Sequence, residues 1–168
     1  ALVANLALRS PNPFQLFLGG VSIYAIYHVV RQHYGFLMLY RAKNGDRRDF
    51  KLDRACLYLG CWLPYLRFLL THPRIRALAS LPATLTWPEV ALAQLLALAF
   101  ALCCVAFTAA ALHRARAGEP TLPKLAYFLT TMLVYGVCFF VIARYEPVYA
   151  PARGPDQEFM LLFTVLSM

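Results

Sequence analysis

Residues Val90 to Leu112 read VALAQLLALAFALCCVAFTAAAL, a run of 23 residues in which Gln94 is the only strongly polar side chain. A helix of this length extends about 35 Å at a rise of about 1.5 Å per residue, which is enough to cross the hydrocarbon core of a bilayer. Its many alanines would let neighbouring helices approach closely in lipid. The run therefore predicts a membrane-spanning helix over about residues 89–112.

Further apolar runs lie on both sides of this stretch, separated by short segments that carry charges, prolines and glycines. We predict an all-α fold, a polytopic transmembrane helix bundle with four spans plus a partial fifth, in a single domain over residues 1–168. Because the chain begins at Ala1 and stops inside an apolar run, we expect it to be a fragment of a longer chain. The predicted spans are about 14–40, 55–71, 89–112, 123–143 and, for the partial fifth, 158–168.

The composition supports this prediction. Apolar residues make up 61% of the 168 residues and charged residues 14%, whereas a soluble domain carries roughly a quarter charged residues. The net charge of +8 lies mainly in short segments between apolar runs, where it is typical of topology signals and of contacts with anionic lipid. We expect the lipid bilayer as a partner and no nucleic acid; other membrane subunits and an apolar or lipid ligand are further candidates.

The basic residues also predict an orientation, because cytoplasmic loops are enriched in lysine and arginine. One side of the membrane would carry nine of them and the other side five. We therefore place the N-terminus outside and the loop 41–54 in the cytoplasm, in a bacterial-type inner membrane or another cellular membrane. The nine are Arg41, Lys43, Arg47, Arg48, Lys51, Arg54, Arg114, Arg116 and Lys124, and the five are Arg9, Arg74, Arg76, Arg144 and Arg153.

A polar stripe on the first predicted span is the main candidate for a functional site. Tyr24, His28, Arg31, Gln32 and Gly35 are spaced i, i+4, i+7, i+8 and i+11, which places them on one face of a helix. Polar side chains at membrane depth usually face partners or water. The eight acidic residues all lie outside the apolar runs, with Glu89 and Glu158 at the first positions of two predicted spans, so the partner of the arginine would be a backbone carbonyl, an aromatic face, a lipid phosphate, a bound ligand or another polypeptide. The alternative is that the stripe ends at the headgroups, where the arginine would snorkel.

Three of the four histidines, His28, His33 and His113, would lie toward the cytoplasmic side, whereas His72 would lie on the other. Imidazole is the commonest metal ligand, so these three residues are candidate metal ligands and iron is a possible cofactor. The segment from His28 to His33 resembles the first H-x(3–4)-H box of membrane-bound histidine-motif di-iron enzymes of the desaturase and hydroxylase type. That resemblance implies oxidation of a lipid or another apolar substrate, with His28 and His33 as ligands. The later HxxHH boxes of that family do not occur in the 168 residues.

Three functions are therefore open, and the sequence identifies no catalytic residue. The chain could be part of a membrane metalloenzyme, a non-catalytic accessory or structural subunit of a larger membrane complex, or a transporter with an intramembrane site at Arg31 and His28. We interpret the five cysteines as small apolar packing residues. Arg67 is expected to snorkel and to make a cation–π contact near Trp62 or Tyr65.

Overall fold

The computed structural model describes residues 11–43, 45, 50–78, 81–82 and 84–141, and the regular structure within these residues is entirely helical. This confirms the predicted all-α fold. A π-helical turn, η1 (Val137–Val141), directly continues the last helix. The helices are α2 (Pro11–Lys43), α3 (Phe50–Thr71), α4 (Pro73–Leu78), α5 (Trp87–Arg116) and α6 (Leu122–Gly136).

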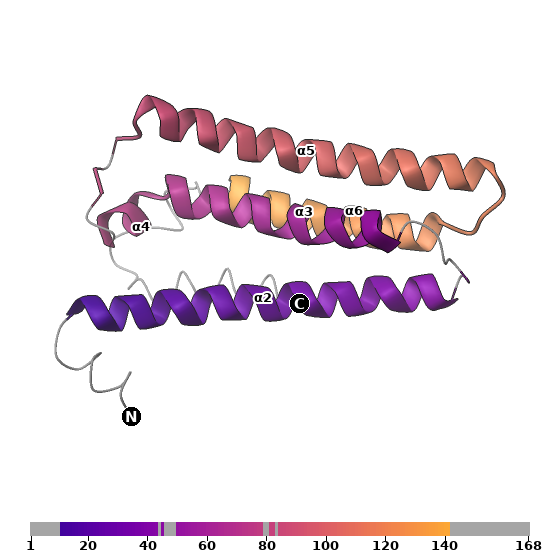
Figure 1. Ribbon diagram of the computed structural model, residues 1–168, viewed down its shortest axis with the longest axis horizontal. Coiled ribbons are helices and arrows are strands. Elements are labelled where there is room, and N and C mark those ends of the chain that lie inside the picture. Colours follow the sequence, from indigo (N-terminus) through magenta and orange to yellow (C-terminus); the bar gives the residue numbers. More distant parts are fainter. Residues whose placement is uncertain (1–10, 44, 46–49, 79–80, 83, 142–168) are drawn as a thin grey trace.

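The four long helices lie side by side and run alternately up and down (Figure 1). Helices α2 and α5 lie on opposite sides of the bundle, and α3 and α6 lie between them; each outer helix contacts both inner ones. The α2–α3 and α5–α6 connections lie at the same end, which we call the Asp53 end. The short helix α4 lies in the connection at the other end, which we call the Arg76 end (Figure 1).

Each of the four full predicted spans corresponds to a helix, but the helices continue into polar residues beyond the apolar runs. Helix α3 begins at Phe50, inside the predicted loop 41–54, and α5 continues to Arg116. Polar side chains at a helix end can reach outward while the backbone hydrogen bonds continue, so apolar runs underestimate helix length. The end of the span 123–143 and the partial fifth, 158–168, lie outside the described residues.

Two of the described helices are long and apolar enough to cross a membrane, namely Trp87–Arg116 and the continuous helix Leu122–Val141. The sequence predicted four spans plus a partial fifth, so composition supports only two of them. Helix α2 is long enough, but its histidines, tyrosines and glutamines lower its hydropathy. Helix α3 carries charged residues near both ends, among them Asp53 and Arg67.

A core of apolar and aromatic side chains fills the interior of the bundle. Phe107 of α5 stacks on Phe128 of α6, with ring centroids 3.7 Å apart, and Tyr65 of α3 meets Phe139 edge to face at 5.7 Å. Cys56, Cys61 and Cys138 are buried, and all five cysteines are free thiols.

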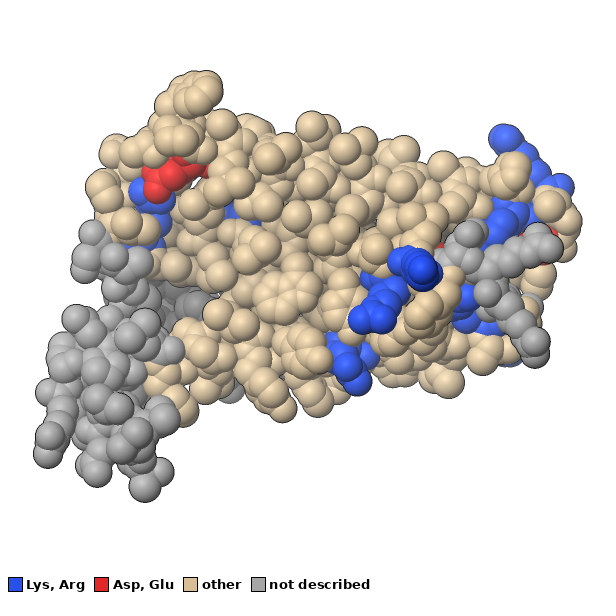
Figure 2. Space-filling view, viewed as in Figure 1, with Lys and Arg blue, Asp and Glu red and all other residues tan. Residues whose placement is uncertain are grey.

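The outer surface of α5 is apolar rather than polar. Only 11% of its most apolar stretch is buried, and leucines project outward along its length, among them Leu95, Leu98 and Leu102. Figure 2 shows a broad surface without charged residues over this helix; charged groups lie toward the two ends of the molecule and, lower in this view, near its middle. Contiguous exposed apolar surface of this kind is typical of a region that contacts a membrane or another protein.

Gly60 lets α3 and α6 pack closely, and its replacement tests this contact. A Cβ atom at Gly60 would collide with the Met132 Sδ, whereas a Cβ atom at Gly136 would lie 3.7 Å from the Phe100 ring, an ordinary contact. We expect Gly60→Ala to destabilise the folded state by about 1 kcal/mol, because the flexible methionine must move in a packed interior. Thermal unfolding in detergent measures this effect, with Gly136→Ala as the matched control. Equal stability of the two variants would contradict the described α3–α6 contact.

Candidate functional site

The polar stripe lies on the outward face of α2. Tyr24 is 68% exposed, and Arg31, Gln32 and Gly35 are also exposed. The rings of Tyr24 and His28 stack with centroids 6.4 Å apart, and His28 Nε2 is hydrogen-bonded to the Gln32 amide at 3.3 Å. These contacts join neighbours one helical turn apart, so the stripe presents a row of polar groups away from the bundle.

Arg31 has one hydrogen bond to a described residue, and that partner is neutral. Its guanidinium donates to Tyr27 Oη at 3.4 Å, also one turn away on α2. The described acidic side chains lie elsewhere: Asp53 and Glu119 at the Asp53 end, and Glu89 at the Arg76 end. Within the described part of the chain, the charge of Arg31 therefore has no carboxylate beside it.

His33 points toward the interior, unlike His28. Its Nδ1 shares a hydrogen bond of 2.8 Å with Tyr127 Oη, and the Tyr135 ring meets it edge to face at 5.7 Å. Its Nε2 and Tyr135 Oη are buried and have no hydrogen-bond partner among the described residues. This histidine is therefore a half-buried packing residue between α2 and α6, and its Nε2 has no hydrogen-bond partner among the described residues.

The structure does not bring the three candidate metal ligands together. Helix α2 is continuous from Pro11 to Lys43, so His28 and His33, five residues apart, face different sides of it. His113 is exposed in the last turn of α5, the outer helix on the opposite side of the bundle. The described residues contain no group of three or more His, Cys, Asp or Glu side chains that could hold a metal ion. The metal site and its iron therefore stay a prediction, because the described helices do not bring the three histidines together.

A buried ionic cluster at the Asp53 end joins all four long helices. Asp53, in the first turn of α3, has a side chain with no exposed surface. Its Oδ2 accepts hydrogen bonds from Arg41 of α2 at 2.8 Å and from Lys124 of α6 at 2.9 Å. Arg114 of α5 lies 3.6 Å from Oδ1. The three cations are at most 6% exposed, so the carboxylate holds charges that are largely removed from water.

Sequence reasoning missed this cluster. It placed Asp53 in the loop 41–54, although an acidic residue just before an apolar run is also typical of the first turn of a helix, where the helix dipole favours negative charge. That signal could have moved the start of α3 to the correct residue. No local pattern could have paired Asp53 with Lys124, which lies 71 residues away.

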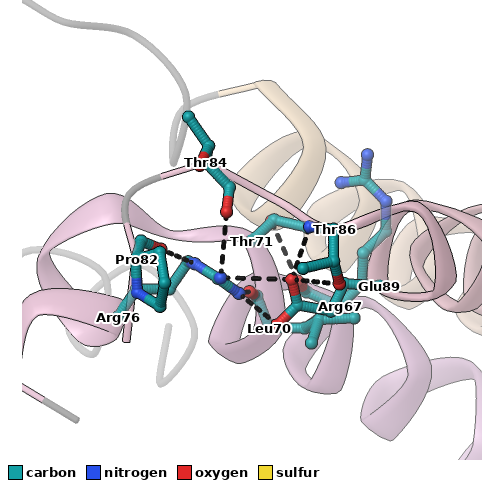
Figure 3. A network of polar contacts seen from close by, with 8 residues as sticks. All are labelled: Arg67, Leu70, Thr71, Arg76, Pro82, Thr84, Thr86 and Glu89. Atoms are coloured by element: carbon teal, nitrogen blue, oxygen red, sulfur yellow. Dashed lines mark hydrogen bonds and ion pairs between the residues drawn. The ribbon is translucent and has the colours of Figure 1, made fainter. Parts of the chain in front are cut away.

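A second ionic cluster, built around the buried Arg76, lies at the Arg76 end (Figure 3). The Arg76 side chain is 1% exposed and contacts both carboxylate oxygens of Glu89, at 2.9 and 3.2 Å. It also donates to the carbonyl oxygens of Leu70, Pro82 and Thr84. Glu89 in turn accepts from the backbone N–H of Thr86, so this network fastens the end of α3 and the α4–α5 connection to the start of α5.

Arg67 makes the predicted type of contact but with another ring. Its guanidinium lies over Phe140, 4.8 Å from the ring centroid, instead of over Trp62 or Tyr65. The side chain is only 6% exposed, so the expectation that it snorkels to the surface was wrong. The packing of η1 against α3, which the sequence does not reveal, covers it.

Comparisons with known proteins add no relative. No family model matches the chain, and no curated protein or solved structure is significantly similar to it. The geometry alone therefore supports the function proposed below.

The Asp53 cluster predicts a large loss of stability when its carboxylate is removed. Asp53→Asn leaves Arg41, Arg114 and Lys124 around a neutral amide, and breaking a buried ion pair costs about 3–5 kcal/mol. We expect a strongly lowered midpoint of unfolding in detergent. The fluorescence of Trp62 and Trp87 would be used to measure this midpoint. Lys51→Gln, an exposed change in the same first turn, is the control and should leave the midpoint nearly unchanged. A midpoint for Asp53→Asn close to that of the control would show that the cluster does not hold the bundle together.

Proposed function

We propose that this chain is a multi-pass integral membrane protein, with all four long helices crossing the bilayer, and that it serves as a non-catalytic subunit of a larger membrane assembly. The observation that carries the proposal is the exposed apolar surface of α5, which extends between two ends held by buried ionic clusters. An apolar helix that is not buried in its own protein requires an apolar environment, and the hydrocarbon core of a bilayer supplies one.

The contacts at both ends support a crossing by α3 as well. At the Asp53 end its first turn pairs with Arg114 of α5, and at the other end Arg76 joins the Leu70 carbonyl to Glu89 of α5. The two helices therefore extend over the same depth. Because α5 is about 45 Å long and apolar, a neighbour fastened to both of its ends would cross the membrane with it.

Helix α2 is attached to α3 at two levels along the bundle. Arg41 pairs with Asp53 at one end. Ser22, which lies nineteen residues before Arg41 and about 28 Å away along the axis of α2, shares a hydrogen bond of 3.2 Å with Tyr65 of α3. With 33 residues, α2 has ample length to span the hydrocarbon core. Its lower hydropathy is explained by the polar stripe rather than by a location in water.

The basic loops support the predicted orientation. Seven of the nine basic residues on the predicted cytoplasmic side are described, and they lie on the helix ends that meet at the Asp53 end: Arg41, Lys43, Lys51, Arg54, Arg114, Arg116 and Lys124. The positive-inside rule then places the Asp53 end in the cytoplasm and the N-terminus outside.

The outward stripe favours a subunit over a self-contained enzyme or transporter. An interior metal site or transport pathway would use side chains that face the middle of the bundle, whereas Tyr24, His28 and Arg31 face outward. Polar groups that project into lipid gain stability when a partner covers them. A subunit interface is therefore the role that fits their direction.

Cysteine labelling tests the crossings. In a variant whose five native cysteines are replaced by alanine, single cysteines would be introduced at Lys43, Thr84 and Ala117, all of which are exposed. Intact cells would be treated with a membrane-impermeant maleimide. We expect labelling of Thr84→Cys, and labelling of Lys43→Cys and Ala117→Cys only after permeabilisation, because α3 and α5 separate these positions.

The same labelling pattern separates the parts of the proposal. Equal reactivity of the three positions in intact cells would contradict the crossings of α3 and α5. The inverse pattern would keep the crossings and contradict the orientation.

A further inference from the structure

Arg31 lies deep within the apolar surface, and its depth can be placed from the structure. On α2, Leu39 is 65% exposed and lies two residues before Arg41 of the Asp53 cluster. On α5, exposed Leu112 lies two residues before Arg114 of the same cluster. Apolar surface thus reaches the Asp53 end on both outer helices. Arg31 is eight residues before Leu39, about 12 Å farther from that end.

An arginine at this depth needs a partner that the described bundle does not supply. Tyr27 offers one neutral oxygen at 3.4 Å, whereas a guanidinium carries five donors in a planar fork. A carboxylate matches this fork with two parallel hydrogen bonds and also neutralises the charge. The groups flanking it, His28 and Gln32, add further hydrogen-bonding capacity on the same outward face.

The shape of this face suits a helix. Gly20 and Gly35, both exposed, have open space where a Cβ atom would lie, and they fall on the same face as Tyr24 and Arg31. Small residues at both ends of the face would let another helix approach the α2 backbone closely. The polar groups would then lie between two such points of approach.

A second copy of the chain fits this face poorly. Two copies joined through α2 would bring two Arg31 side chains into one interface at low dielectric, where like charges repel strongly. Charge complementarity favours a different polypeptide that contributes the negative charge.

We infer that the outward face of α2, formed by Gly20, Tyr24, His28, Arg31, Gln32 and Gly35, binds a transmembrane helix of another polypeptide that carries an aspartate or glutamate at the depth of Arg31. The carboxylate pairs with the guanidinium, and the glycines allow close contact of the two helices. This inference rests on the proposed function, since it requires α2 to cross the membrane.

The test uses synthetic transmembrane helices as probes. Three leucine-rich peptides, identical except for Glu, Gln or Leu at the central position, would be reconstituted with the labelled 168-residue chain in phosphatidylcholine vesicles. Association would be followed by fluorescence energy transfer. We expect the Glu peptide to bind about tenfold more tightly than the Leu peptide and more tightly than the Gln peptide. Arg31→Leu should abolish this preference, and Gln94→Leu, which removes an exposed polar side chain from α5, should retain it.

Three results would overturn the inference. Equal binding of the three peptides to an inserted chain would mean that lipid phosphates or the chain itself satisfy Arg31. Energy transfer between two copies of the chain, lost in Arg31→Leu, would assign the face to self-association. Absence of a transmembrane arrangement, measured by maleimide protection at Lys43→Cys and Thr84→Cys in the same vesicles, would overturn the proposed function and the inference together. The first two results leave the proposed membrane crossings intact.

Discussion

The arrangement of the four long helices depends on the ion pairs of the buried Asp53 carboxylate. One buried side chain of α3 contacts cations from α2, α5 and α6, so each helix is fixed at the same level. Buried charges are costly to remove from water, and such a group persists when opposite charge and hydrogen bonds surround it. The cluster specifies which ends of the helices meet, a choice that apolar packing alone leaves open.

Arg76 and Glu89 provide the corresponding restraint at the other end. Trp87, where α5 begins, and Arg114, in the Asp53 cluster, are 27 residues apart, or about 40 Å along the helix. That distance matches a hydrocarbon core together with part of its interfaces. Charge is thus concentrated at the two ends, and the surface of α5 between them is apolar. Apart from Gln94 on α5, the described surface between the ends carries its main group of polar side chains at Arg31 and its neighbours on α2.

The helices could be predicted from the sequence because long apolar runs with few charges leave little alternative to helix. The spacing of Tyr24, His28 and Arg31 likewise placed them on one side of α2. Which side faces outward depends on where α3 and α6 pack, and no local pattern contains that information. For the same reason His28 and His33 could be grouped as ligands, although the structure turns one outward and the other toward Tyr127. The Asp53 cluster was missed because two of its three cations, Arg114 and Lys124, come from helices remote in the sequence.

The central claim is that lipid surrounds the apolar exterior between the two ionic clusters. Nitroxide labels at Val90, Leu95, Leu102, Val105 and Leu112 of α5, all outward-facing, would report their depth in a bilayer through relative access to oxygen and to a water-soluble nickel chelate. The account predicts that the ratio of oxygen to nickel access is greatest near Leu102 and falls toward both ends of the helix. A flat profile with high nickel access at every position would contradict it.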